Sequence, residues 1–187
     1  MQLAIYPCKI FAEFVEQNSI PNIVICEVGC YQGETTTVYA PVIKKHNGKI
    51  ILIDWFRGNE EVVQEQLHGL DNRPADDVYN NLVSNLQEID CLDITTIYRE
   101  RSDTGYKNIA DNSLDICFLD ACHQYEDVRN DILNYLPKVK SGGLLTGHDF
   151  DQPPVYQAVT ELLPGITTIN DYPPPIGVHH PVWIYRK

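Results

Sequence analysis

Short runs of apolar residues recur along the chain, and turns rich in Gly, Asp or Asn separate them from stretches with a helical pattern. Near-continuous apolar runs of this length are typical of parallel strands that are covered on both faces. The pattern predicts five buried strands, of which the third is the weakest, at residues 23–28, 50–54, 94–100, 114–120 and 142–149. A further apolar run at residues 182–187 predicts another strand.

Between these runs, apolar residues spaced three and four apart predict helices. One such stretch has a single apolar face, formed by Tyr125, Val128, Ile132 and Leu136. Pro137 and a turn at residues 141–143 are expected to end this helix. Residues 35–45 and 75–86 predict two more helices. Strands that alternate with helices predict right-handed βαβ crossovers and a doubly wound α/β sheet.

Nothing in the pattern separates a second domain, and residues 69–77 are expected to form a polar surface loop. A chain of 187 residues is long enough for one domain with a substantial core, so residues 1–187 are expected to form a single domain. No run approaches the roughly 20 apolar residues of a membrane-spanning helix. The first residues also lack the basic and apolar regions of a signal peptide, so no cleaved leader is expected.

The formal net charge is -12, with a pI near 4.7. This balance argues against nucleic acid and against an anionic membrane surface as partners, because phosphate binding depends on clustered Lys and Arg. A small neutral or cationic substrate is expected instead. Assembly as a homo-oligomer is left open by the composition.

The six cysteines contain no C-x-x-C pair, so a structural metal or a redox site is not expected. Cys26 and Cys117 lie inside apolar runs, where a reduced Cys acts as a small hydrophobic residue. A disulfide framework would be unusual in a chain with this much core. The cysteines therefore predict reduced thiols and a cytoplasmic location.

The first predicted strand ends in a turn with the sequence E-V-G-C-Y-Q-G at residues 27–33. Gly29 can adopt the backbone angles of a tight turn and lets a ligand approach the backbone, and Gly33 permits close packing at the helix start. Glu27 would repel a pyrophosphate but attract an ammonium or sulfonium group, and the G-x-G-x-x-G spacing of dinucleotide binders is absent. The turn thus predicts a site for an aminoacyl cofactor; a plain glycine turn without a ligand is the alternative.

Asp54 ends the second predicted strand, roughly 20 residues beyond this turn, where a carboxylate typically binds ribose hydroxyls. Trp55 follows and is expected either to lie on an adenine face or simply to pack against its neighbours.

The chain resembles the class I S-adenosylmethionine-dependent methyltransferases in five motifs, which are E-V-G-C-Y-x-G, I-D-W-F-R-G, D-N-S-L-D-I-C-F-L-D-A-C-H-x-Y-E-D-V, L-P-K-V-K-S-G-G and G-H-D-F. More narrowly, it is similar to a small bacterial and phage branch related to sugar and macrolide O-methyltransferases. The resemblance covers residues 20–163 and is most specific over residues 111–150. It implies a Rossmann-like, mostly parallel seven-stranded sheet of order 3-2-1-4-5-7-6, with the seventh strand antiparallel and helices on both faces.

The resemblance also implies S-adenosylmethionine as the methyl donor. The cofactor-binding residues that it implies are Glu27, Gly29, Cys30, Tyr31, Gly33, Asp54, Trp55, Ser102 and Asp120. Members of the family often carry an acid followed by Ser after the third strand, beside the adenine. In this chain Arg101 stands in the place of the acid, Ser102 matches, and Asp103 could substitute for the missing carboxylate.

Polar residues also follow the fourth and fifth predicted strands, namely Asp120, His123, His148 and Asp149. The carboxyl ends of neighbouring parallel strands meet at one edge of the sheet, so these side chains are expected to converge there. His123 is the predicted general base, because a neutral imidazole can accept a hydroxyl proton near neutral pH. Asp120 is expected to share the catalytic site with it.

A divalent metal such as Mg²⁺ is a further expectation, with Asp120, His148 and Asp149 as its ligands. Metal-dependent sugar and macrolide O-methyltransferases place an acid after strand four, a His base three residues later and an acidic pair after strand five. His148 stands where the first acid of that pair would be, and imidazole is a poorer ligand for Mg²⁺ than carboxylate. Asp120 and Asp149 could instead cap the helices that follow them.

The predicted function is therefore S-adenosylmethionine-dependent O-methylation of a small hydroxylated acceptor such as a sugar, mainly by alignment of the reacting groups. Residues 58–75 and 172–181 are expected, by position alone, to form the walls of the acceptor pocket. The alternatives are a metal-independent N- or C-methyltransferase and a non-catalytic Rossmann-like binding module, because fold alone does not establish activity.

Overall fold

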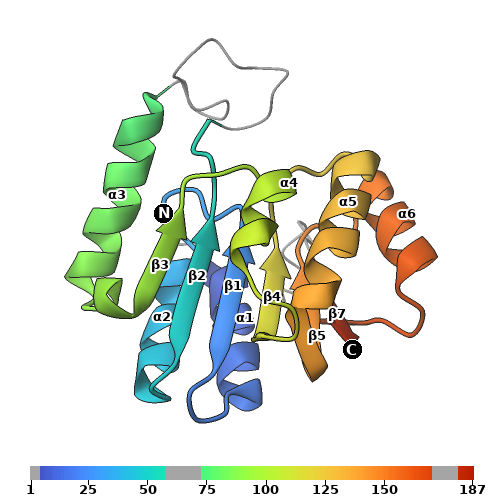
Figure 1. Ribbon diagram of the computed structural model, residues 1–187, viewed down its shortest axis with the longest axis horizontal. Helices are drawn as coiled ribbons and strands as arrows, with labels where there is room; N and C mark the ends of the chain where they lie inside the picture. The colour runs from blue at the N-terminus through green and yellow to red at the C-terminus, as the bar shows by residue number, and fades with distance from the viewer. Residues whose placement is uncertain (1–4, 58–72, 170–180) are drawn as a thin grey trace.

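A computed structural model of the chain describes residues 5–57, 73–169 and 181–187. In this part of the chain seven strands form one sheet of order β3-β2-β1-β4-β5-β7-β6 (Figure 1). The strands are β1 Val24–Val28, β2 Lys49–Ile53, β3 Thr95–Tyr98, β4 Leu114–Leu119, β5 Val139–Gly147, β6 Thr167–Ile169 and β7 Val182–Arg186. The first five run parallel, and β7 lies antiparallel between β5 and β6. The Rossmann-like order expected from the sequence is confirmed.

Helices cover both faces of this sheet (Figure 1). They are α1 Ile5–Asn18, α2 Thr36–Lys45, α3 Ala75–Glu88, α4 Ser102–Gly105, α5 Tyr125–Tyr135 and α6 Pro153–Leu162. In the described residues, single 3₁₀ turns lie at Leu92–Ile94, Tyr106–Asn108 and Leu136–Lys138. None of the helices in the described residues is long and apolar enough to cross a membrane.

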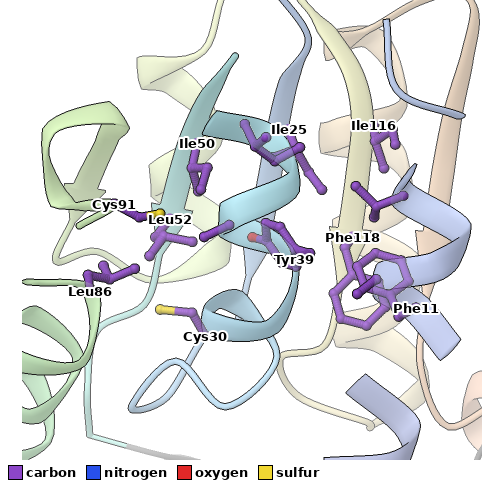
Figure 2. Close-up of a cluster of buried hydrophobic side chains, with 14 of the residues drawn as sticks. Phe11, Ile25, Cys30, Tyr39, Ile50, Leu52, Leu86, Cys91, Ile116 and Phe118 are labelled. Atoms are coloured by element: carbon purple, nitrogen blue, oxygen red, sulfur yellow. The ribbon is translucent and has the colours of Figure 1, made fainter. Parts of the chain in front are cut away.

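Alternation of side chains along each strand divides the core into two layers. In β1, Ile25 packs with α1, α2 and α3 on one face, whereas Cys26 packs with α5 and α6 on the other. Figure 2 shows part of the first layer, in which the rings of Phe11 and Phe118 stack with their centroids 4.2 Å apart. The same alternation directs Glu27 toward the face that α2 covers.

One sequence prediction was wrong. The chain does not turn at residues 141–143, because β5 begins at Val139 and continues through them to Gly147. Gly142 has a φ of +80°, and the register between β4 and β5 shifts between Leu114 and Ile116. A β-bulge uses glycine at positive φ just as a turn does, so the local pattern alone did not distinguish the two.

Two glycines set the shape of the turn after β1. Gly29 has a φ of +87°, and a Cβ atom there would lie 2.2 Å from the backbone oxygen of Asp120. A Cβ atom at Gly33 would lie 2.6 Å from Leu82 Cδ1 of α3. Gly33 has a φ of +84°, so both positions favour glycine through their backbone conformation, and at Gly29 the turn also passes too close to the residue after β4 for a side chain.

Candidate functional site

The register of the parallel strands places the polar residues after β1, β2, β4 and β5 at one edge of the sheet. Val28 pairs with Ile53 on one side and with Leu119 on the other. Leu119 in turn pairs with Gly147. Gly29, Asp54, Asp120 and His148 are the next residues along these strands, and the backbone N–H group of each still bonds the neighbouring strand. This is the edge toward which the arrowheads of β2, β3 and β4 point in Figure 1.

Asp54 fixes two turns at this edge. Its Oδ2 accepts a hydrogen bond of 2.8 Å from the backbone N–H of Tyr31, and its Oδ1 accepts one of 2.6 Å from that of Phe56. Tyr31 and Phe56 have positive φ angles of 49° and 61°, a conformation that costs a bulky residue about 1–2 kcal/mol. Asp54 therefore holds two strained turns in place beside each other, one after β1 and one after β2.

Glu27 does not line the open side of the turn. It is 1% exposed, and its Oε2 accepts hydrogen bonds from Thr36 Oγ1 at 2.6 Å and from Tyr39 Oη at 2.8 Å. Burial raises the pKa of Glu27 to about 7, because it outweighs these two hydrogen bonds to the charged form. Cys30 likewise points its thiol into the core (Figure 2), so its backbone is what remains for a ligand.

The raised pKa of Glu27 predicts a pH-dependent stability. The folded protein keeps a proton that the unfolded chain releases above its ordinary pKa of 4.5, so stability falls as the pH rises from about 4.5 to 7. We expect the free energy of unfolding of the wild type to decrease by on the order of 3 kcal/mol relative to Glu27→Gln over this window. Urea unfolding at pH 5 and pH 8 measures it. Parallel pH profiles of the two proteins would contradict the expectation, and Glu34→Gln, an exposed acid in the same turn, is the control.

Beyond β4 and β5 the structure brings together the four polar residues that the sequence singled out. His123 Nε2 lies 3.1 Å from Asp149 Oδ2 and 3.4 Å from Asp120 Oδ1. His148 Nδ1 lies 3.3 Å from the same Asp149 oxygen and 3.9 Å from Asp120 Oδ1. His123 Nε2 is buried but makes no well-oriented hydrogen bond within the described part of the chain. Two acids and two imidazoles thus form one compact cluster.

The acids and the histidines in this cluster stabilise each other's charged forms. Burial favours the neutral form of Asp149, but a hydrogen bond from His148 and the charges of both histidines lower its pKa to about 2. Burial disfavours the charged imidazolium of His123, yet the carboxylates of Asp120 and Asp149 outweigh it and raise its pKa above the ordinary value. Neither acid caps the next helix, because the N-cap residues of α5 and α6 are Gln124 and Gln152.

Candidate ligand atoms for a metal ion also converge here. One nitrogen of His123 and one oxygen each of Asp120 and Asp149 lie within 4.8 Å of one another. A buried imidazole nitrogen without a well-oriented hydrogen bond, placed between two carboxylates, fits a divalent cation. This set of candidate metal ligands differs from the sequence prediction in one residue, because it contains His123 in place of His148.

A cavity of about 540 Å³ opens beside the ends of β2 and β3, which we call the β2–β3 cavity. Its lining residues are Trp55, Arg57, Pro74, Ala75, Asp76, Arg99, Glu100 and Arg101. The guanidinium of Arg101 lies over the Trp55 ring, 5.1 Å from its centroid, and pairs with Asp103 at 3.1 Å. Trp55, predicted to lie on an adenine, therefore borders a cavity in the size range of small-molecule sites. One face of its ring is in contact with the Arg101 guanidinium.

Ser102, expected beside the adenine, is not among the residues that line this cavity and directly follows one of them, Arg101. Its carbonyl oxygen accepts a hydrogen bond of 2.9 Å from Tyr135 Oη of α5. Burial raises the pKa of Asp131 of the same helix to about 7, although the nearby Ser102 hydroxyl lowers it in part. Sequence reasoning missed Asp131. The signal was present, because an acid at this position falls on the apolar face between Val128 and Tyr135.

Several predicted features lie outside the described residues or have a structural role. Most of the two expected acceptor-pocket walls, residues 58–72 and 172–180, lie outside them. The loop expected at residues 69–77 is described only from residue 73 and ends at Pro74, because α3 begins at Ala75. Burial and the neighbouring Asp127 raise the pKa of Cys122 to about 11, so its thiol is not an activated nucleophile.

Comparison with known proteins identifies related families and folds. The profile of a family described as "Methyltransferase domain" matches residues 26–150. No curated protein matches the chain significantly. Among solved structures, the O-methyltransferase NovP is 18% identical with a TM-score of 0.69, over 98% of this chain and 79% of that chain.

Two further solved structures have a similar fold. An O-methyltransferase from Bacillus cereus in complex with SAH is 14% identical with a TM-score of 0.66, over 96% of this chain and 80% of that chain. A protein from Clostridium thermocellum described as an rRNA methylase is 11% identical with a TM-score of 0.66, over 95% and 96% of the two chains. At such low identities the likeness to these structures is one of fold.

Proposed function

Because the chain belongs to the family of methyltransferase domains, whose methyl donor is S-adenosylmethionine, we propose that it methylates an oxygen atom of a small hydroxylated acceptor such as a sugar. The observation that carries the proposal is the cluster of His123 with Asp120 and Asp149 at the same sheet edge as the glycine turn. The cluster supplies a proton acceptor, and the turn supplies a cofactor site.

The residues around the turn fit the cofactor. S-adenosylmethionine carries a cationic sulfonium and an ammonium group, and the carboxylates of Asp54 and Asp120 follow β2 and β4 on either side of the turn after β1. Asp54 would bind the ribose hydroxyls, because it ends β2 at the same sheet edge as the glycine turn and its carboxylate holds the backbone of that turn at Tyr31. The backbone of residues 29–33 would hold the amino-acid end, and Trp55, which lines the β2–β3 cavity, would contact the adenine.

When bound, S-adenosylmethionine supplies a methyl group on a positively charged sulfur. As the acceptor oxygen takes up this methyl group, His123 Nε2 would accept the hydroxyl proton. For this role the ring proton must lie on Nδ1, where the side-chain amide of Gln152 is 3.4 Å away. A half-turn of that amide presents its carbonyl oxygen to Nδ1–H, and Asp149 then stabilises the imidazolium that forms.

The converging ligand atoms favour a second role for the same residues. Asp120, His123 and Asp149 would hold a divalent cation, which would orient an acceptor hydroxyl and lower its pKa. An imidazole in the ligand set favours Fe²⁺, Ni²⁺ or Zn²⁺ over Mg²⁺. The two roles exclude each other at His123, because one lone pair on Nε2 cannot bind both a proton and a metal ion.

Calorimetry with S-adenosylmethionine and its demethylated product tests the cofactor, and transfer of labelled methyl from S-adenosylmethionine tests the acceptor. The acceptor panel contains sugars and other hydroxylated metabolites, amines, and RNA. We expect binding of both nucleosides and label transfer to a hydroxylated small molecule. The absence of binding at millimolar concentration, or transfer to RNA or amines alone, would overturn the proposal. Loss of turnover with a chelator would assign His123 to a metal ion.

A further inference from the structure

We propose that Asn85 of α3 is a positioning residue for the cofactor, which fixes the peptide group between Gln32 and Gly33 in the glycine turn. This role rests on the proposed function, because the ligand of the turn is taken to be the amino-acid end of S-adenosylmethionine. Asn85 belongs neither to the turn nor to the cluster of His123, and it is half-buried on a helix that packs against the turn.

The peptide group between Gln32 and Gly33 is held at both of its polar atoms. The side-chain amide of Asn85 donates a hydrogen bond of 2.9 Å from Nδ2 to the Gln32 carbonyl oxygen. The Gly33 N–H donates one of 2.8 Å to the Cys30 carbonyl oxygen, within the turn itself. Asn85 therefore supplies, from outside the turn, the contact that sets the direction of this carbonyl group.

Glycine makes the same peptide group easy to rotate. Gly33 has a φ of +84°, and a residue without a Cβ atom adopts positive and negative φ about equally readily. Tyr31, two residues earlier, has a φ of +49°, which is uncommon for a bulky residue. The turn thus combines one residue with many accessible conformations and one in an unfavourable conformation. The hydrogen bond from Asn85 stabilises one arrangement among those that the backbone allows.

A second residue next to α3 holds the side chains of the turn. Arg73 Nη2 donates hydrogen bonds to Tyr31 Oη at 2.5 Å and to Gln32 Oε1 at 3.1 Å. Its guanidinium carbon also lies 5.7 Å from the centroid of the Tyr31 ring. The backbone groups of the same two residues are bound by Asp54 and Asn85. The end of β2 and the α3 segment therefore hold the turn together, and Asn85 is the backbone contact that α3 provides.

A preformed turn binds its ligand more tightly. A ligand that fits only one arrangement loses affinity in proportion to the fraction of molecules that adopt other arrangements. The backbone of residues 29–33 is proposed to contact the amino-acid end of the cofactor, whereas Trp55 is proposed to contact the adenine. Loss of the Asn85 contact should therefore weaken binding of the amino-acid end and leave binding of the nucleoside unchanged.

Calorimetric binding of two related nucleosides tests this role. S-adenosylhomocysteine carries the amino-acid end, and methylthioadenosine has the same nucleoside and sulfur without it. We expect Asn85→Ala to raise the Kd for S-adenosylhomocysteine about threefold to tenfold, the effect of a turn whose binding arrangement is populated in about 10–30% of molecules. The Kd for methylthioadenosine should stay within about twofold of wild type, because this ligand does not occupy the turn.

Two further variants distinguish the hydrogen bond from packing and from helix stability. Asn85→Asp keeps the size of the side chain, but a carboxylate cannot donate to the Gln32 carbonyl oxygen. It should weaken binding of S-adenosylhomocysteine at least as much as Asn85→Ala. Asn81→Ala is the matched control, since it makes the same substitution at an exposed position one helical turn earlier in α3. It should leave both Kd values unchanged.

The outcomes that contradict this role are distinct from those that contradict the proposed function. Unchanged binding of S-adenosylhomocysteine by Asn85→Ala would overturn the role of Asn85. An equal loss for both nucleosides would overturn it as well, because it would indicate a general effect on the fold. Wild-type affinity in Asn85→Asp would exclude the hydrogen bond as the cause. Failure of the wild type to bind S-adenosylhomocysteine at millimolar concentration would overturn the proposed function together with this role.

Discussion

Replacing His123 by alanine is expected to lower kcat for methyl transfer by about 10²- to 10⁴-fold, the usual contribution of a positioned general base. The affinity for S-adenosylhomocysteine should stay within about threefold of wild type, because His123 contacts Asp120, Asp149 and Gln152 rather than the turn after β1. Steady-state kinetics on the acceptor identified by label transfer, together with calorimetry, measure the two effects separately.

The matched control for this variant is His46→Ala. His46 also has a buried Nε2 without a hydrogen-bond partner in the described residues, and it lies 3.7 Å from the carboxylate of Glu16. It follows α2 and lies at the opposite edge of the sheet, next to Asn47 and the start of β2. If His46→Ala lowered kcat as much as His123→Ala does, a general loss of stability would explain both effects. If His123→Ala left kcat unchanged, His123 would be excluded as general base and as metal ligand.

Most of the fold could be predicted because its signals are local. The runs that became β1, β2 and β4 are apolar on both faces, since helices cover both sides of the sheet. The helices at residues 36–45, 75–88 and 125–135 are each marked by apolar spacing and begin or end within two residues of the prediction. The strand order, the presence of a seventh strand and the antiparallel direction of the last strand came from the family resemblance, because no local pattern specifies which strands are neighbours.

The candidate site was predictable in its residues but not in its contacts. Asp120, His123, His148 and Asp149 follow strand ends, so the register alone brings them together. The side-chain direction of Glu27 depends on which helix covers its face of the sheet, and that is a tertiary property.

The burial of Asp131 was missed for a different reason. A helical acid is normally taken for a solvent-exposed residue, although this one lies three residues after Val128 and four before Tyr135, on the apolar face of the helix. The local spacing therefore carried the signal, and the residue type outweighed it.

Replacing Asp54 by alanine should reduce the affinity for S-adenosylhomocysteine by at least about 100-fold. The variant removes the carboxylate proposed to bind the ribose, and it leaves the N–H groups of Tyr31 and Phe56 without their acceptor. Each lost charge-assisted hydrogen bond costs about 1.5–3 kcal/mol, and both residues have strained positive φ angles that Asp54 helps to maintain. Calorimetry and urea unfolding should therefore both report a large loss.

Two further variants separate binding from stability. Asp54→Asn should resemble Asp54→Ala, because an amide offers one acceptor oxygen where the two turns require two. Asp115→Ala removes a carboxylate that accepts the backbone N–H of Val24 at 2.8 Å at the opposite edge of the sheet. It should lower stability by a similar amount and leave the affinity for S-adenosylhomocysteine unchanged. If Asp115→Ala weakened binding as much as Asp54→Ala, the role of Asp54 would be structural and the ribose site would have to lie elsewhere.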